Sequence, residues 1–252
     1  MEELPTNPHE VQTHPKTADA GRTVRMRHIL RKYIAPGLIE HVRKAADNEL
    51  TSIPNQEATL TFFFADLVSF TAWAEHRTPD ETVNMLNLSI GATSSVIRHW
   101  GGQVNKFMGD SLFATFDDPI RAVGAGIEMQ KQFQILNLIS VKQEDEPEIR
   151  VRVGIHTGPC ILASIGTEDY MDFTPIGDSV NIAARLEKAC SPGAVLVSKA
   201  AAQIIGDSIL TAHPITVEVK GKSMPIDACH VDRIRYSGPK GTIEIGIDDD
   251  LF

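Results

Sequence analysis

Two aspartates in this sequence stand where a free carboxylate is unexpected. Asp66 ends the apolar run FFFAD at residues 62–66, and Asp110 lies in a Met-Gly-Asp-Ser turn. A charge next to buried phenylalanines is costly unless it is paired or takes up a proton. If the two carboxylates met, each would raise the pKa of the other until a cation neutralised them. Oxygen ligands of this kind suit Mg²⁺ or Mn²⁺, with water and substrate phosphate completing the coordination shell.

Each aspartate also has an ordinary interpretation. Asp66 could be a solvated residue at a strand end, because charged residues are mostly exposed. Asp110 could bond its own backbone, as aspartates in turns commonly do. The metal hypothesis therefore needs a fold that brings residues 66 and 110 together.

The patterns of strands and helices around these residues predict such a fold. A helix begins with a capping box at Thr78 and Glu81 and stops at Gly101-Gly102. Alternation predicts a strand over 58–67, a hairpin over 102–116 and a strand over 148–158, and helices are expected from about 119 and over 177–190. This order, β-α-β-β-α-β followed by further elements, predicts an α+β fold with a ferredoxin-like core and extra C-terminal elements. The first strand of that core would lie beside the hairpin, so Asp66 and Asp110 could converge.

The segments around this core differ from it in composition. Residues 1–21 are rich in Pro, Thr, His and Glu and are expected to form a disordered tail, and residues 22–56 carry a helical pattern interrupted at Pro36. Residues 57–234 would form the functional domain. Residues 235–252 turn polar and acidic and are expected to be a second tail.

Composition narrows the classes of function. A chain of 252 residues with 42% hydrophobic content is long enough for one globular core. Three cysteines without metal-ligand spacing favour free thiols in a reducing, cytoplasmic compartment, with neither zinc nor disulfides. We find no apolar signal core at the N-terminus and no membrane-spanning run in the sequence. The net charge of −9 disfavours nucleic acid as a partner.

Four segments together resemble a known family. They are FFFADLVSFTAWAE (62–75), VNKFMGDSLFATF (104–116), RVGIHTG (152–158) and FTPIGDSVNIAARLE (173–187). In order and spacing they resemble the catalytic motifs of class III nucleotide cyclases, over roughly residues 57 to 232. The resemblance implies that Asp66 and Asp110 hold two divalent ions per site, Mg²⁺ or Mn²⁺. It also implies that the backbone from Leu67 to Thr71, including Phe70, surrounds the phosphates, and that Leu67 lies beside the metals as well.

The resemblance assigns the chemical step to a pair of residues on one helix. Asn181 and Arg185 are four residues apart and project from one helix face. In the family the Asn contacts the ribose and the Arg the α-phosphate, where charge builds in the transition state. A solvated Arg185 paired with Glu187 or Asp178 is the alternative.

Two further cations match the family's triphosphate-binding residues. They are Arg152, in the strand, and Lys220. Lys220 is the weaker match, because Lys222 lies close by and charged residues near a late strand are usually solvated.

Base recognition is implied for Lys106 and Thr174. A Lys donor suits N1 of adenine and a hydroxyl acceptor suits its N6 amine, whereas guanine would face Lys106 donor to donor. ATP is therefore the expected substrate. Thr174 is typical of the subgroup that includes soluble and cyanobacterial adenylyl cyclases, many of them stimulated by bicarbonate. Lys106 could instead be a surface residue of the hairpin, and Thr174 an ordinary extended residue before Pro175.

The resemblance also implies how the protein assembles. In the family the metal aspartates come from one subunit, and the base and transition-state residues come from its partner. Because this chain carries both sets, we expect a homodimer with two shared active sites. The alternatives are a guanylyl cyclase and a catalytically silent, cyclase-like domain that regulates by dimerising.

Overall fold

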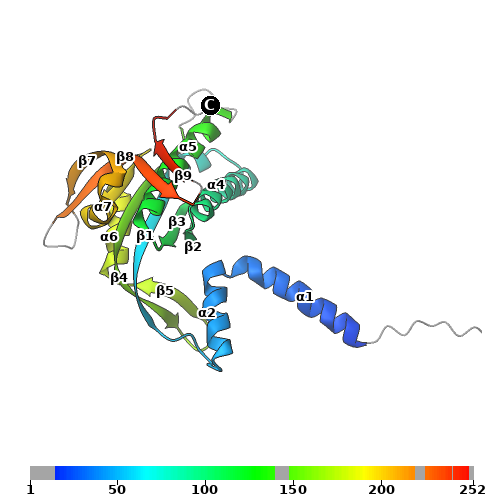
Figure 1. Cartoon of the computed structure of the whole chain (residues 1–252). Helices are drawn as coiled ribbons and strands as arrows, with labels where there is room; N and C mark the ends of the chain where they lie inside the picture. Colours follow the sequence, from blue (N-terminus) through cyan, green and yellow to red (C-terminus); the bar gives the residue numbers. More distant parts are fainter. Residues whose placement is uncertain (1–14, 140–147, 219–224, 240, 250–252) are drawn as a thin grey trace, which may run out of the picture.

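The computed structural model describes residues 15–139, 148–218, 225–239 and 241–249. In these residues nine strands form one mixed sheet, and helices cover both of its faces (Figure 1). The strands are β1 (Gln56–Val68), β2 (Gln103–Met108), β3 (Ser111–Phe116), β4 (Arg150–Gly166), β5 (Met171–Ile176), β6 (Val195–Ser198), β7 (Ile209–Val217), β8 (Ile226–Gly238) and β9 (Gly241–Gly246). The helices are α1 (Pro15–Tyr33), α2 (Pro36–Asp47), α3 (Phe70–Ala74), α4 (Pro79–His99), α5 (Pro119–Ile139), α6 (Asp178–Ala189) and α7 (Lys199–Ile205), with a 3₁₀ turn η1 (Gly206–Ser208).

The strand order confirms the predicted ferredoxin-like core. The main path through the sheet is β2-β3-β1-β4-β6-β8-β7, while β5 pairs with β4 and β9 pairs with β8. The three pairs β2–β3, β3–β1 and β1–β4 are antiparallel, and β4 pairs with β6 in parallel. Strand β1 therefore lies between β3 and β4. The predicted proximity of β1 to the β2–β3 hairpin is therefore correct.

The run of three phenylalanines is explained by a sheet that is covered on both faces. Phe63 is buried in the main core, beneath residues of α4 and α5 such as Ile97 and Ile127. Phe62 is buried on the other face with Ala183 of α6. Because successive strand residues point to opposite faces, a strand buried on both sides reads as a continuous apolar run. Asp66 is on the same face as Phe62, towards α6.

The N-terminal helices confirm the break at Pro36 and correct the start of the helical region. Helix α1 begins at Pro15 rather than at residue 22, with proline in a first-turn position where its missing N–H is harmless. The rest of the predicted tail, residues 1–14, lies outside the described residues. Helix α1 extends away from the sheet, whereas α2 lies against it (Figure 1). The ring of His41 on α2 lies 4.7 Å from the ring of Phe173 on β5.

The predicted acidic tail over 235–252 is wrong in its first half. Strand β8 continues to Gly238, and β9 returns along it with Ile243 opposite Tyr236. The side chain of Ile245 packs against the main core. The carboxylate of Asp249 accepts a hydrogen bond of 2.6 Å from the backbone N–H of Gly246 and pairs with Arg233 at 2.5 Å. The alternation in TIEIGI was a strand signal that the surrounding polar residues obscured.

The described helices include none that combines the length and the apolar character needed to cross a lipid bilayer.

Candidate active site

Asp66 occupies the centre of a small polar cluster at the end of β1. The strand register places it opposite Ser111 on β3 and opposite Arg152 on β4. Its Oδ1 accepts a hydrogen bond of 2.5 Å from the hydroxyl of Ser111, and its Oδ2 accepts one of 2.6 Å from Nη2 of Arg152. The acid that ends the apolar run is thus paired from both neighbouring strands, which offsets the cost of its partial burial.

Asp110 lies in the two-residue turn between β2 and β3. The turn needs Gly109, whose φ of +67° is a conformation that side chains rarely adopt. Burial raises the pKa of Asp110, and the negative charge of Asp66 raises it further. Both aspartates line one small cavity, together with Leu67, Ser111 and residues of α4. The predicted convergence of residues 66 and 110 is therefore present in the fold.

This pair of carboxylates fits a divalent cation. Two carboxylates that repel each other gain when a positive charge lies between them, and carboxylate oxygens are the ligands that Mg²⁺ and Mn²⁺ prefer. Across the described ranges no three His, Cys, Asp or Glu side chains form a metal-binding group. Asp66 and Asp110 could hold such ions with their carboxylates, and the backbone of Leu67 lies beside the same cavity.

We expect Asp110→Asn to raise the melting temperature of the metal-free protein at neutral pH. Because the pKa of Asp110 is raised in the folded state, its contribution to stability is complete below its ordinary value of 3.8 and is lost as the pH rises through the raised value. At pH 7 the ionised carboxylate therefore destabilises the fold, and the amide removes that cost. The gain should shrink towards pH 4, when thermal unfolding is followed in EDTA.

The control for this prediction is Asp169→Asn, because Asp169 is exposed on the turn before β5. Adding Mg²⁺ or Mn²⁺ should stabilise the wild type and the control but not Asp110→Asn. A melting temperature that falls in Asp110→Asn at every pH would contradict the repulsion between the two carboxylates.

Arg152, predicted to bind the triphosphate, is held between two acids of its own chain. Its Nη2 contacts Asp66, and its Nε lies 2.6 Å from Oε1 of Glu187 on α6. Burial lowers the pKa of Arg152, but the hydrogen bond to Asp66 and the charge of Glu187 outweigh this effect and raise it. Burial raises the pKa of Glu187, although Arg152 opposes this. The sequence suggested Glu187 only as a partner for Arg185, so its pairing with Arg152 was missed.

Helix α6 lies unusually close to β4, and Gly154 is the reason. A Cβ at position 154 would lie 2.1 Å from the backbone nitrogen of Glu187 and 2.6 Å from the carbonyl oxygen of Ala183. Only glycine permits this approach. The contact fixes the helix that carries Asn181 and Arg185, and it brings Glu187 within reach of Arg152.

Asn181 and Arg185 lie on α6, outside the lining of the small cavity that the two aspartates share. Asn181 is exposed, and the cavity beside Asp66 and Asp110 is lined by neither residue of the pair. Nη1 of Arg185 is buried without a hydrogen-bond partner among the described residues. A buried guanidinium nitrogen without a partner is costly, so it suggests a position prepared for an anion.

Lys106 on β2 and Thr174 on β5 belong to strands that are not paired with each other, and Asp172 links them. Nζ of Lys106 on β2 forms an ion pair with the carboxylate of Asp172 on β5. Thr174 follows Asp172 by two residues, so their side chains share one face of β5. Asp172 could have been found by its alternation with Thr174, but no local pattern predicted its partner.

The remaining predicted residues lie as follows. Leu67 and Phe70 are buried in the main core, so their contribution to any ligand would come from the backbone. Thr71 is exposed in the first turn of α3. Lys220 lies outside the described residues.

The family model for the adenylate and guanylate cyclase catalytic domain matches residues 53–230 of this chain. Among curated proteins, the chain is 32% identical over 184 residues to the terminal-differentiation specific adenylate cyclase of Dictyostelium discoideum, and 30% identical over 181 residues to adenylate cyclase 1 of Rhizobium meliloti (strain 1021). These alignments cover 69% and 68% of this chain but 8% and 27% of the relatives, so the chain spans less than a third of their length.

Solved structures agree with this assignment. The adenylyl cyclase CyaB from P. aeruginosa is similar with a TM-score of 0.67 and 31% identity, covering 71% of this chain and 95% of CyaB. The guanylyl cyclase Cya2 is similar with a TM-score of 0.65 and 30% identity, covering 71% of this chain and 93% of Cya2. Nearly equal similarity to an adenylyl and a guanylyl cyclase leaves the choice of base to the residues of the site. Because the family model matches residues 53–230, this chain belongs to the adenylate and guanylate cyclase catalytic domain family.

Proposed function

We propose that this protein is an adenylyl cyclase, which converts ATP to 3′,5′-cyclic AMP and pyrophosphate. In this reaction the ribose 3′-oxygen forms a bond to the α-phosphorus, the bond from that phosphorus to the bridging oxygen of the β-phosphate breaks, and the 3′-hydroxyl proton leaves to solvent. The observation that carries the proposal is the convergence of Asp66 and Asp110, whose mutual repulsion marks a place for cations. When bound there, two Mg²⁺ or Mn²⁺ ions would activate the 3′-hydroxyl and offset charge on the leaving pyrophosphate.

The choice of ATP over GTP rests on the pair formed by Lys106 and Asp172. The carboxylate of Asp172 forms an ion pair with the Lys106 amine and directs it from β2 towards β5. A charged amine donates to N1 of adenine but meets an N–H in guanine, and the unpaired donor costs roughly 1 to 3 kcal/mol. The hydroxyl of Thr174 can accept from the adenine N6 amine.

Asn181 and Arg185 complete the chemistry from the other half of the site. Arg185 has an unpartnered guanidinium nitrogen that would donate to the α-phosphate oxygens, where negative charge increases in the transition state. Asn181, one helical turn earlier, would hold the ribose so that its 3′-oxygen faces phosphorus.

We infer that the active protein is a homodimer with two shared sites. Asn181 and Arg185 are not among the residues that line the cavity shared by Asp66 and Asp110, which is compatible with a site completed by a second chain. A second copy in a two-fold arrangement would bring the halves of different chains together twice.

The test is incubation of the purified protein with ATP or GTP and Mg²⁺ or Mn²⁺, with and without bicarbonate, reading out cyclic nucleotide. We expect cyclic AMP from ATP, little product from GTP, and none from Asp66→Ala. Preferential cyclic GMP formation would make the protein a guanylyl cyclase, and no product with either nucleotide would favour the silent regulatory domain. Stimulation by bicarbonate stays a prediction, which the same assay decides.

A further inference from the structure

Arg150 is the next cation after Arg152 along the same face of β4. The antiparallel register places Arg152 opposite Asp66 and Arg150 opposite Val68, the last residue of β1. Residues two apart on a strand point to the same side, so Arg150 follows Arg152 on the face that carries Asp66. It lies further towards Ser69, the residue between β1 and α3. The family resemblance places the backbone of this segment around the phosphates.

A cavity lies between Arg150 and Ser69. It has a volume of about 330 Å³ and is lined by Val68, Ser69, Glu148, Arg150 and Pro192. This is roughly ten times the volume of one water molecule in the liquid, so a phosphate group fits with its hydration. Ser69 adopts a φ of +71°, which is rare for a residue with a side chain and turns the backbone sharply at the cavity wall.

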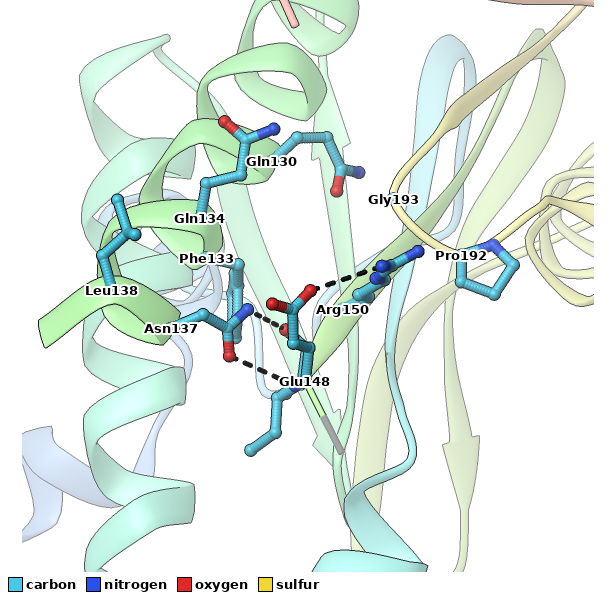
Figure 2. A pocket seen from close by; sticks show the side chains of 10 residues that line it. Gln130, Phe133, Gln134, Asn137, Leu138, Glu148, Arg150, Pro192 and Gly193 are labelled. Carbon is cyan, nitrogen blue, oxygen red and sulfur yellow. Dashed lines mark hydrogen bonds and ion pairs between the residues drawn. The ribbon is translucent and has the colours of Figure 1, made fainter. Parts of the chain in front are cut away.

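The surroundings of the two arginines differ in a way that favours Arg150 as a phosphate ligand. Arg152 contacts two acids whose side chains are 14% and 8% exposed, so much of its charge is already compensated where solvent screening is weak. Arg150 is 57% exposed and pairs with Glu148, itself 48% exposed, at 3.3 Å. Exposed ion pairs contribute little and exchange readily. Figure 2 shows Arg150 extended between Glu148 and Pro192, with its guanidinium directed to Glu148.

We propose that Arg150 is a further substrate-binding residue. Its guanidinium gives up the ion pair with Glu148 and binds the terminal phosphates of the nucleotide and the pyrophosphate product. The inference rests on the proposed function and extends it, because it assigns to the outer end of the polyphosphate a cation that lies beyond Arg152. A guanidinium can donate two parallel hydrogen bonds to a phosphate, so it positions the leaving group as well as attracting it.

The kinetic test compares Arg150→Gln with Arg150→Lys and a matched control. The control is Arg235→Gln, because Arg235 is 53% exposed and pairs with Glu244 on the distant β8–β9 hairpin. We expect Arg150→Gln to raise the KM for ATP about five- to tenfold and to weaken inhibition by pyrophosphate similarly, with kcat changed less than twofold. Arg150→Lys should recover part of the loss, and Arg235→Gln should match the wild type. An unchanged KM in Arg150→Gln, or equal changes in both Gln variants, would overturn the proposal.

A binding test separates this inference from the proposed function. Inorganic tripolyphosphate is titrated calorimetrically into each variant of the 252-residue chain without divalent metal, and folding is checked by thermal unfolding. Arg150→Gln should bind tripolyphosphate more weakly than Arg235→Gln, and Glu148→Gln should bind it more tightly, because it removes the competing carboxylate. If the wild type makes no cyclic nucleotide but this order of affinities holds, the proposed function fails and the phosphate site stands. Equal affinities in all variants would refute the phosphate site even in an active cyclase.

Discussion

Mixing Asp66→Ala chains with Arg185→Ala chains should restore cyclase activity that neither variant has alone. Asp66→Ala removes a carboxylate proposed to bind metal, and Arg185→Ala removes the guanidinium proposed to contact the α-phosphate, so each variant should lose a hundredfold or more of the activity. In a mixed dimer one of the two sites would contain both lesions and the other neither. With equal amounts and random exchange, half of the dimers are mixed, and activity should recover to about a quarter of the wild type.

This result depends on the proposal that Asn181 and Arg185 act on a nucleotide bound at the two aspartates of the other chain. The measurement is cyclic nucleotide formation after co-incubation under conditions where subunits exchange, with dimer content followed by light scattering. Two Asp66→Ala preparations mixed with each other serve as the control and should stay inactive. If exchange is demonstrated and the Asp66→Ala and Arg185→Ala mixture remains inactive, shared sites are excluded.

Exchanging the base-reading residues is expected to reverse the nucleotide preference. Lys106→Glu with Thr174→Cys should lower kcat/KM for ATP about a hundredfold, because adenine N1 would then face an acceptor and N6 would lose one. The same changes offer guanine an acceptor for its ring N–H. Asp172 complicates the exchange, because Lys106→Glu would place two carboxylates where an ion pair now lies.

The structure therefore predicts that Asp172→Asn improves the exchanged enzyme. GTP turnover should be higher in the triple variant than in the double variant, whereas Asp172→Asn alone should weaken ATP use by releasing Lys106. Steady-state kinetics with both nucleotides measure these effects. An ATP preference that survives in the triple variant would mean that other residues read the base.

The elements whose signals are local could be predicted from the sequence. The capping box at Thr78 and Glu81 starts α4, and the glycine of the Met-Gly-Asp-Ser turn closes the β2–β3 hairpin. Because the ferredoxin-like order follows from these elements, so did the approach of Asp66 to Asp110. Their ability to bind cations and nucleotide is a separate matter, which the experiments above decide.

The features that arise from packing could not be predicted. The pairing of Arg152 with Glu187 depends on where α6 lies on the sheet, and the pairing of Lys106 with Asp172 joins strands far apart in sequence. Strand β9 was obscured because acidic residues surround its alternating isoleucines. Helix α6 itself begins at Asp178, with Gly177 as its N-cap and no capping side chain.

The contact of α6 with Gly154 makes the helix and the sheet mechanically stiff relative to each other. With backbone against backbone, no flexible side chain is available to absorb a displacement of β4. A displacement of β4, or of β5 beside it, would therefore move Asn181 and Arg185 by nearly the same amount. Helix α2 contacts β5 through His41 and Phe173, and β5 pairs with β4. A displacement of the N-terminal helices could therefore be passed through β5 and β4 to the residues proposed to act on the nucleotide.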